Sequence, residues 1–148
     1  MEPFVPVWRR VYPHVTMLLD PYDLVPRVIL QTGSWEPDSW RVVAKHLHPG
    51  GTFVDVGAHI GYYSLEAAPL VGPGGRVIAV EPNPETVRRL RDNIGASGAT
   101  NVVSVQPVAC SDVEATLDLF AAPRASATSR SARRNTRGSS SSTQAFRH

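Results

Sequence analysis

The sequence of 148 residues has little of what secreted, membrane or metal-binding proteins need. It has one cysteine, Cys110, which excludes an internal disulfide and a metal site built from cysteines. No apolar run approaches the ~20 residues that a helix needs to cross a bilayer, and the first residues show no leader with a basic and then an apolar region. We therefore expect a cytoplasmic protein without a membrane partner. Lysine is scarce as well, since Lys45 is the one lysine among 15 basic residues, which is typical of a GC-rich, bacterial genome.

Acidic residues are missing from one end of the chain. Residues 119–148 hold six arginines and no acid, a charge of +6, whereas residues 1–118 hold nine basic and 13 acidic residues, a charge of −4. Residues 121–148 contain Phe146 as their one large apolar residue, so we predict a disordered Ser/Arg-rich tail over 121–148. Phe146 is the one aromatic residue of the tail, so the tail does not favour nucleic-acid binding by base stacking. Weak, salt-sensitive contact with nucleic acid or anionic surfaces is the alternative.

Short apolar runs alternate with helical periodicity between residues 37 and 108. This order predicts an α/β fold with a doubly wound, mainly parallel sheet. We expect three parts: an N-terminal strand and helix region (1–50), a half-domain (51–120) and the tail (121–148). Strands are predicted at 15–19, 52–56, 76–81, 101–108 and 115–120, helices at 37–47, 62–71 and from 84 to about 95, and the type of 25–30 stays open.

Several local features sharpen these predictions. The apolar strand 52–56 is expected to be buried on both faces, as in a parallel sheet. Pro69 is expected to kink or end its helix early. Asn83 is expected to cap the next helix, with Pro84 at its first position. That helix should bury Val87, Leu90 and Ile94 and turn Arg88, Arg89 and Arg91 to water.

The most informative stretch is the loop 57–61 after the strand 52–56. Ligands of doubly wound folds lie beyond the carboxyl ends of the strands. Gly57 lets the backbone turn sharply and approach a ligand closely, and Gly61 lets the following helix start close to the sheet. Glu81 ends the next strand, where a carboxylate can accept hydrogen bonds from both hydroxyls of a ribose.

Three ligands use such a site, and the residues favour one of them. A phosphate-binding P-loop needs a lysine that this loop lacks. A dinucleotide site uses G-x-G-x-x-G, whereas the spacing here is G-x-x-x-G with His59 inside it, and Asp55 would repel a pyrophosphate. Asp55 suits an ammonium group, so S-adenosylmethionine, with an amino-acid end and a ribose, fits better. A ligand-free turn is the plain alternative.

The sequence resembles the FkbM-type S-adenosylmethionine-dependent methyltransferases, which have a class I, Rossmann-like fold. The resemblance covers about residues 15–118. Its motifs are Gly33-Ser34-Trp35-Glu36-Pro37, Asp55-Val56-Gly57-Ala58-His59-Ile60-Gly61, Glu81-Pro82-Asn83-Pro84, Leu90-Arg91-Asp92-Asn93 and Ala109-Cys110-Ser111-Asp112.

The resemblance implies a role for each matched position. Asp55, Gly57, Ala58 and His59 would line the methionine end of S-adenosylmethionine, with Gly61 closing the loop. Glu81 would bind the ribose hydroxyls. Around the adenine would lie Pro82, Asn83, Val108 and Ala109. The role of Glu36 stays open, and of Tyr62 and Tyr63 one is expected to face the cofactor, while Trp35 and Trp40 are most simply core residues.

This sequence departs from the family pattern at two places. His59 stands where the family commonly has Asn, another planar polar side chain. Nothing after Ser111 matches the Lys-x-Asp-x-Glu-Gly motif that the family places beside the methyl group, which indicates a chain truncated at its C-terminus. The strand 52–56 would then present an open edge.

The sequence therefore predicts a methyltransferase that acts on an oxygen of a small metabolite or sugar, with a small-molecule hydroxyl acceptor as partner. No general base, metal site or oligomeric state is assigned. The rival hypothesis is a non-catalytic remnant that binds S-adenosylmethionine weakly or not at all.

Overall fold

The computed structural model describes residues 5–113 and 118–119 of the chain. Its contacts divide the chain into two units, Met1–Cys110 and Ser111–His148. The predicted tail and most of the predicted strand 115–120 lie outside the described residues. The first unit contains β1 (Val7–Tyr12), β2 (Val15–Leu19), α1 (Leu24–Thr32), α2 (Pro37–Ala44), β3 (Thr52–Val56), α3 (Tyr62–Val71), β4 (Arg76–Val80), α4 (Pro84–Ala96) and β5 (Val103–Gln106).

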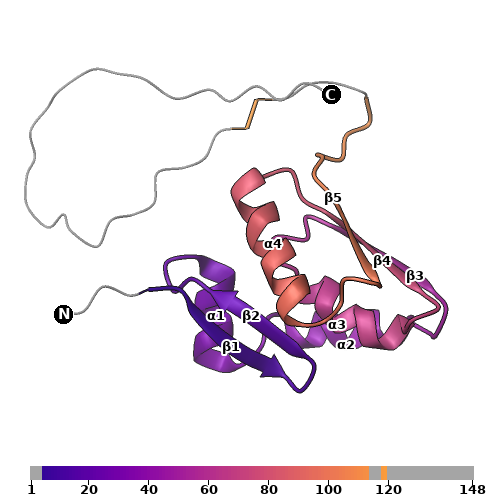
Figure 1. The fold of residues 1–148 in the computed structure, drawn as a ribbon, viewed down its shortest axis with the longest axis horizontal. Helices are drawn as coiled ribbons and strands as arrows, with labels where there is room; N and C mark the ends of the chain where they lie inside the picture. The colour runs from indigo at the N-terminus through magenta and orange to yellow at the C-terminus, as the bar shows by residue number, and fades with distance from the viewer. Residues whose placement is uncertain (1–4, 114–117, 120–148) are drawn as a thin grey trace, which may run out of the picture. The chain divides into compact units, whose positions relative to one another are not determined.

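The centre of this unit is a parallel sheet in the order β3-β4-β5 (Figure 1). Thr52 pairs with Arg76 and Val77 pairs with Val103, and all three strands run in the same direction. Helices α3 and α4 make the two crossovers, so the predicted Rossmann-like α/β order is confirmed. The parallel arrangement brings the residues that follow β3, β4 and β5 to one edge of the sheet.

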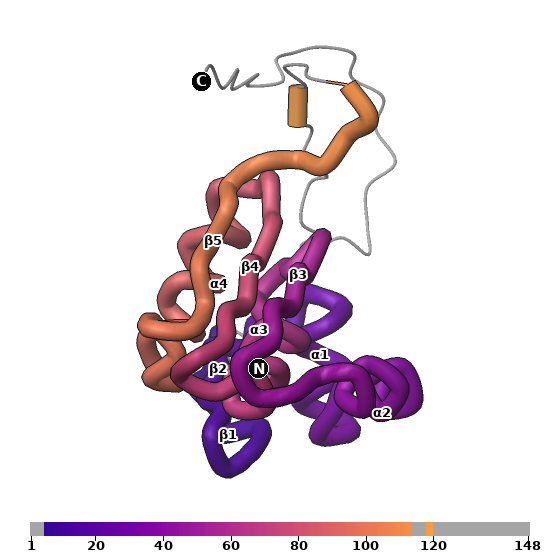
Figure 2. Tube along the Cα trace, turned by 90° about the vertical axis from the view of Figure 1, so that its right-hand side faces the viewer, coloured from indigo at the N-terminus to yellow at the C-terminus, as the bar shows by residue number. Residues whose placement is uncertain are grey.

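One face of this sheet is bare in the described part of the chain, so the prediction that β3 is buried on both faces is wrong. Val54 is 52% exposed and Val56 is 61% exposed. In Figure 2 the three strands lie in front of both α3 and α4, which cover the other face, where Val77 and Ala79 are fully buried. An apolar run identifies a strand, but it does not tell which elements cover its two sides.

Of the two effects predicted for Pro69 in the helix α3, the early end is wrong, and the kink stays a prediction. The helix continues to Val71, and the amide of Gly72 donates to the carbonyl of Ala68 at 3.0 Å. Proline removes one backbone hydrogen bond from the helix, whereas the core packs around nearly its whole surface, including Leu65 and Val71. Tertiary packing therefore outweighs the local preference.

The helix α4 begins as predicted. The side chain of Asn83 accepts hydrogen bonds from the amides of Glu85 (2.9 Å) and Thr86 (3.2 Å), and Pro84 is the first helical residue. Its predicted apolar side is buried too, with Val87, Leu90 and Ile94 each less than 5% exposed.

Arg89 was predicted to face water, and this is wrong. Its side chain is 11% exposed and forms ion pairs with Asp20 at 3.4 Å and with Glu85 at 2.9 Å. The prediction grouped Arg89 with Arg88 and Arg91, and these two are exposed. The difference arises because Asp20, from the N-terminal region, packs over this part of α4.

The N-terminal region forms an antiparallel hairpin, β1 with β2, followed by α1. The sequence predicted β2 but not β1, and it left the type of α1 open. The hairpin lies on the far side of the helices from the sheet (Figure 1). Asn93 of α4 is fully buried and connects the layers, because it accepts from the amide of Leu18 at 2.7 Å and donates to the carbonyl of Ile60 at 2.8 Å.

The helix α2 is shorter than predicted. It ends at Ala44, so Leu47 follows it in a turn, although Leu47 still packs against the core. Within the described ranges, no helix combines the length and the apolarity needed to cross a membrane.

Candidate cofactor site

The loop 57–61 follows β3 and is held by hydrogen bonds to the end of β4. The amides of Gly57 and Ala58 both donate to the carbonyl of Val80, at 2.9 and 3.0 Å. The amide of His59 donates to Oε2 of Glu81 at 3.0 Å. These amides already have protein acceptors, so they are not available to hold a pyrophosphate, which argues against the dinucleotide alternative.

The backbone conformation of this loop explains why it contains two glycines. Gly57 and Gly61 have φ angles of 80° and 92°, in the left-handed region that favours glycine. A Cβ on Gly61 would lie 2.5 Å from Cδ1 of Leu90 in α4. Gly61 therefore lets α3 start close against α4, whereas the sequence suggested close approach to the sheet. His59 also adopts the left-handed conformation, with φ 51°.

A cavity of ≈ 340 Å³ opens at this loop. It is lined by Val25, Trp35, Asp55, Val56, Gly57, Ala58, His59, Ile60, Tyr62 and Tyr63. The four residues predicted for the methionine end, Asp55, Gly57, Ala58 and His59, are thus brought together. Gly61, the last residue of the loop, is buried and does not line the cavity.

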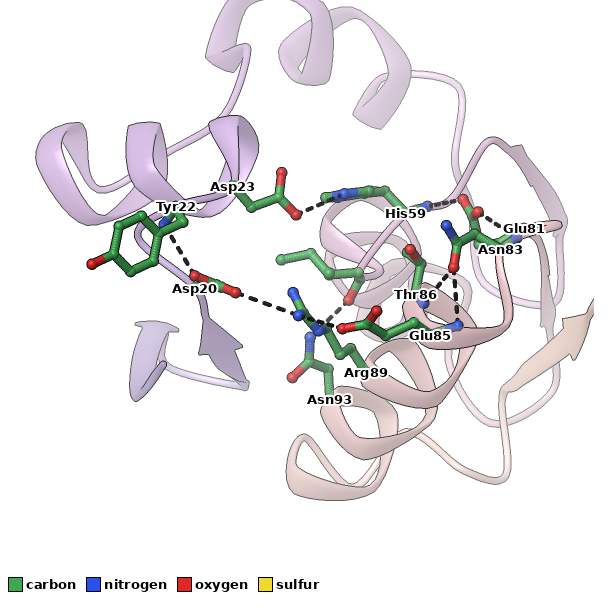
Figure 3. Close-up of polar contacts among 11 residues, drawn as sticks. Asp20, Tyr22, Asp23, His59, Glu81, Asn83, Glu85, Thr86, Arg89 and Asn93 are labelled. Carbon is green, nitrogen blue, oxygen red and sulfur yellow. Dashed lines mark hydrogen bonds and ion pairs between the residues drawn. The ribbon is translucent and has the colours of Figure 1, made fainter. Parts of the chain in front are cut away.

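The residues predicted for the ribose and the adenine do not line this cavity. Glu81 is joined to the loop through His59, and its other oxygen accepts from the amide of Asn83 at 2.9 Å (Figure 3). Pro82 and Asn83 follow on the same turn and are partly exposed. Val108 and Ala109 follow β5 and are exposed, so their predicted contact with an adenine ring stays a prediction.

The walls of the cavity include residues that the sequence did not assign to it. Trp35 and Val25 come from the N-terminal region, and Trp35 was expected to be a core residue. Tyr62 and Tyr63 both line the cavity, although one of them was expected to pack elsewhere. The one signal for Trp35 was its place in the motif that ends with Pro37.

The two tyrosines differ in their hydrogen bonds. The Tyr62 hydroxyl pairs with that of Tyr12 at 2.6 Å, whereas the Tyr63 hydroxyl donates to Oε2 of Glu36 at 3.1 Å. Burial, aided by the bond to Glu36, raises the pKa of Tyr63. Glu36 has φ 43°, an unfavourable angle for a residue other than glycine. The cavity wall therefore carries a protonated phenol bonded to an exposed carboxylate.

Two acidic side chains lie at the ends of neighbouring strands. Burial raises the pKa of Asp55, and the Glu81 carboxylate raises it further, while the hydroxyl of Ser64, which donates at 2.6 Å, acts in the opposite direction. Glu81 is 8% exposed. A cation bound here would relieve the repulsion between the carboxylates, whereas an anion would add to it. Among the described residues, no group of three or more metal-ligating side chains stands close enough to hold a metal ion.

The parallel sheet with its ligand loop at the carboxyl ends of the strands is typical of Rossmann-like α/β proteins. Among solved structures, the TYW2 protein of P. horikoshii, in complex with MeSAdo, superposes with a TM-score of 0.56 at 20% identity. The superposition covers 78% of this chain and 40% of that protein. This similarity supports the fold.

A family model described as the methyltransferase FkbM domain matches residues 55–145, more than half of the chain, which therefore belongs to this family. The match confirms the resemblance, and S-adenosylmethionine is the cofactor of this class of enzymes. It begins at Asp55, so it contains the loop 57–61 and Glu81, and it extends beyond residue 118, where the motif resemblance ends.

Curated relatives match shorter stretches. The protein-L-isoaspartate O-methyltransferase of Aeropyrum pernix is 49% identical over 57 residues, which are 38% of this chain and 22% of that protein. The arsenite methyltransferase of Halobacterium salinarum is 36% identical over 73 residues, which are 49% of this chain and 18% of that protein. The chain thus spans about a fifth of the length of these two relatives.

Proposed function

We propose that the chain binds S-adenosylmethionine and transfers its methyl group to an oxygen of a small metabolite or sugar. The observation that carries the proposal is the pair of carboxylates, Asp55 and Glu81, beside a loop in which the first three amides, of residues 57–59, already have protein acceptors. S-adenosylmethionine brings a sulfonium, an ammonium group and a ribose, and it has no phosphate. Family membership supports the same cofactor.

Each part of the cofactor has candidate partners in the chain. Asp55 and the loop residues Gly57, Ala58 and His59 would hold the methionine end inside the cavity. Glu81 has two carboxylate oxygens that each accept one backbone amide, which leaves further lone pairs for the ribose hydroxyls. Pro82, Asn83, Val108 and Ala109 would surround the adenine.

The chemistry requires positioning more than activation by the protein. When bound, S-adenosylmethionine supplies a methyl group already activated on its sulfonium sulfur. Trp35, Tyr62 and Tyr63 line the cavity, and their rings would limit the access of water and orient an acceptor. Glu36 Oε2 holds the proton of Tyr63, so this pair offers an acceptor hydroxyl a hydrogen-bond partner. The named acceptors of the two relatives, a protein and arsenite, differ from each other. They therefore leave the acceptor open.

A non-catalytic remnant is the second candidate function. It is favoured by the bare face of the sheet, where Val54 and Val56 are exposed. Such a protein would bind the cofactor weakly or not at all.

Calorimetric titration of the chain with S-adenosylmethionine tests the proposal. We expect binding, and we expect Glu81→Gln to weaken it about 10- to 100-fold, because hydrogen bonds to a charged group contribute about 1.5–3 kcal/mol. Glu85→Gln, an exposed carboxylate on the first turn of α4, is the matched control and should bind normally. Absence of binding heat in the parent chain would contradict the proposal. Binding without turnover of any hydroxyl acceptor would favour the remnant.

A further inference from the structure

Two polar contacts of His59, one from its ring and one from its backbone amide, connect the N-terminal region to the proposed ribose site. Oδ2 of Asp23 lies 3.2 Å from Nε2 of His59, and the amide of His59 donates to Oε2 of Glu81 at 3.0 Å. Figure 3 shows His59 between the two carboxylates. Asp23 precedes α1, whereas His59 and Glu81 follow β3 and β4.

His59 depends on its neighbours for its conformation. Its φ of 51° is rare for a side chain larger than that of glycine and persists where the surroundings hold it. On the ring, Nδ1 is buried and has no hydrogen-bond partner in the described part of the chain. Asp23 therefore provides the polar contact that orients the ring, and Glu81 accepts from the backbone of the same residue.

Asp23 is itself well anchored. Its amide donates to the carbonyl of Asp20 at 3.0 Å, and its carbonyl accepts from Arg27 at 3.0 Å. The Asp20 carboxylate pairs with Arg89 of α4. The hydrogen bond from His59 lowers the pKa of Asp23, so its carboxyl is ionised at neutral pH. A fixed, charged acceptor therefore faces the His59 ring.

We propose that Asp23 is a positioning residue for the cofactor site, since its carboxylate orients His59 and the His59 amide orients Glu81 toward the ribose. This inference rests on the proposed function. Asp23 acts through two other residues. Loss of its charge should therefore weaken the part of the binding that comes from the ribose hydroxyls and leave the contribution of the rest of the ligand unchanged.

The experiment compares two ligands by calorimetry on the full chain: S-adenosylhomocysteine and its 2′-deoxy analogue. Glu81 should make the parent prefer the ribose form. We expect Asp23→Asn to weaken binding of S-adenosylhomocysteine about three- to tenfold, the range for a charge-assisted hydrogen bond that is partly exposed. Binding of the 2′-deoxy analogue should change less, so the ratio between the affinities for the two ligands should become smaller. Asp38→Asn changes an exposed carboxylate of α2, with 89% side-chain exposure, and should behave as the parent.

A second variant separates positioning from general damage. His59→Asn keeps a residue that tolerates the left-handed conformation but removes the ring. It should weaken binding of S-adenosylhomocysteine as much as Asp23→Asn does. The double variant should bind no more weakly than either single variant. Circular dichroism reports whether each variant folds.

Each alternative result has one meaning. The positioning role is overturned if Asp23→Asn weakens the binding of both ligands equally. It is also overturned if Asp23→Asn and His59→Asn both keep the ribose preference of the parent. If Glu81→Gln loses the preference while those two variants keep it, the proposed function stands and this inference fails. If the parent chain does not bind S-adenosylhomocysteine, both fail.

Discussion

Glu66 offers a direct test of how tightly the core around α3 is packed. Its side chain lies on α3 and is 7% exposed, and its Oε1 has no hydrogen-bond partner within the described ranges. Burial raises its pKa to about 7, against the opposing effect of a hydrogen bond with Trp40. We therefore predict that Glu66→Gln changes the dependence of stability on pH.

The sign and size follow from the pKa. A folded-state pKa above the usual 4.5 means that the folded chain holds this proton more tightly than the unfolded chain. The corresponding stability is fully present below pH ~4.5 and is lost as the pH rises to about 7. A shift of this size corresponds to about 3 kcal/mol in the free energy of unfolding. Because Gln has no proton to lose, the stability of Glu66→Gln relative to the parent should rise by about that amount between pH 4.5 and pH 8.

Urea unfolding followed by tryptophan fluorescence at several pH values measures this difference. Asp92→Asn, which removes a half-exposed carboxylate on α4, is the control and should run parallel to the parent. A constant difference between Glu66→Gln and the parent across this pH range would refute the reasoning. It would mean that water or a rearrangement solvates the Glu66 carboxylate.

Two further substitutions test the packing around α4. Gly61→Ala should lower the free energy of unfolding by about 2–5 kcal/mol, because the new methyl would lie 2.5 Å from Leu90 and the residue has φ 92°. A decrease below about 1 kcal/mol, measured by urea unfolding, would contradict this packing. Arg89→Met should cost about 3 kcal/mol because it removes a cation from the buried carboxylate of Asp20. Arg91→Met, on the exposed side of the same helix, should change the midpoint of urea unfolding little, and equal effects of the two would contradict the ion pair.

Local patterns predicted much of the sheet and its ligand loop. The strand β3 is an apolar run between two glycines, and β4 is an apolar run that follows two glycines. Asn83 followed by Pro84 is a strong helix start. Asp55, Gly57 and His59 meet at the cavity because they lie at the end of one strand and in the loop directly after it. These features depend on residues that are close in the sequence.

Other features depend on contacts between distant residues, which no local pattern contains. The Arg89 side chain is 11% exposed because Asp20 packs over it, whereas the neighbouring Arg88 has the same local sequence context but stays exposed. The exposure of Val54 depends on which helices cover the sheet. The strand β1 was missed because Arg9 and Arg10 interrupt its apolar pattern.

The cavity walls were harder to predict than the loop for the same reason. Trp35 and Val25 precede β3 in the chain, and their place at the loop depends on how the N-terminal region folds back. Asp23 reaches His59 in the same way. The sequence therefore predicted one side of the site, the side built by β3 and β4, and not the side supplied by α1 and the segment after it.

The position of the hairpin also has a consequence for the order of folding during synthesis. Leu18 of β2 bonds Asn93, 75 residues later, and Thr16 bonds Ser97, 81 residues later. Ribosomes add roughly 5–20 residues per second, so roughly 4–15 s separate the two partners. Until α4 exists, β2 has β1 as its partner, and a two-stranded hairpin alone is marginally stable in water. The hairpin is therefore fixed in place only after α4 has been synthesised.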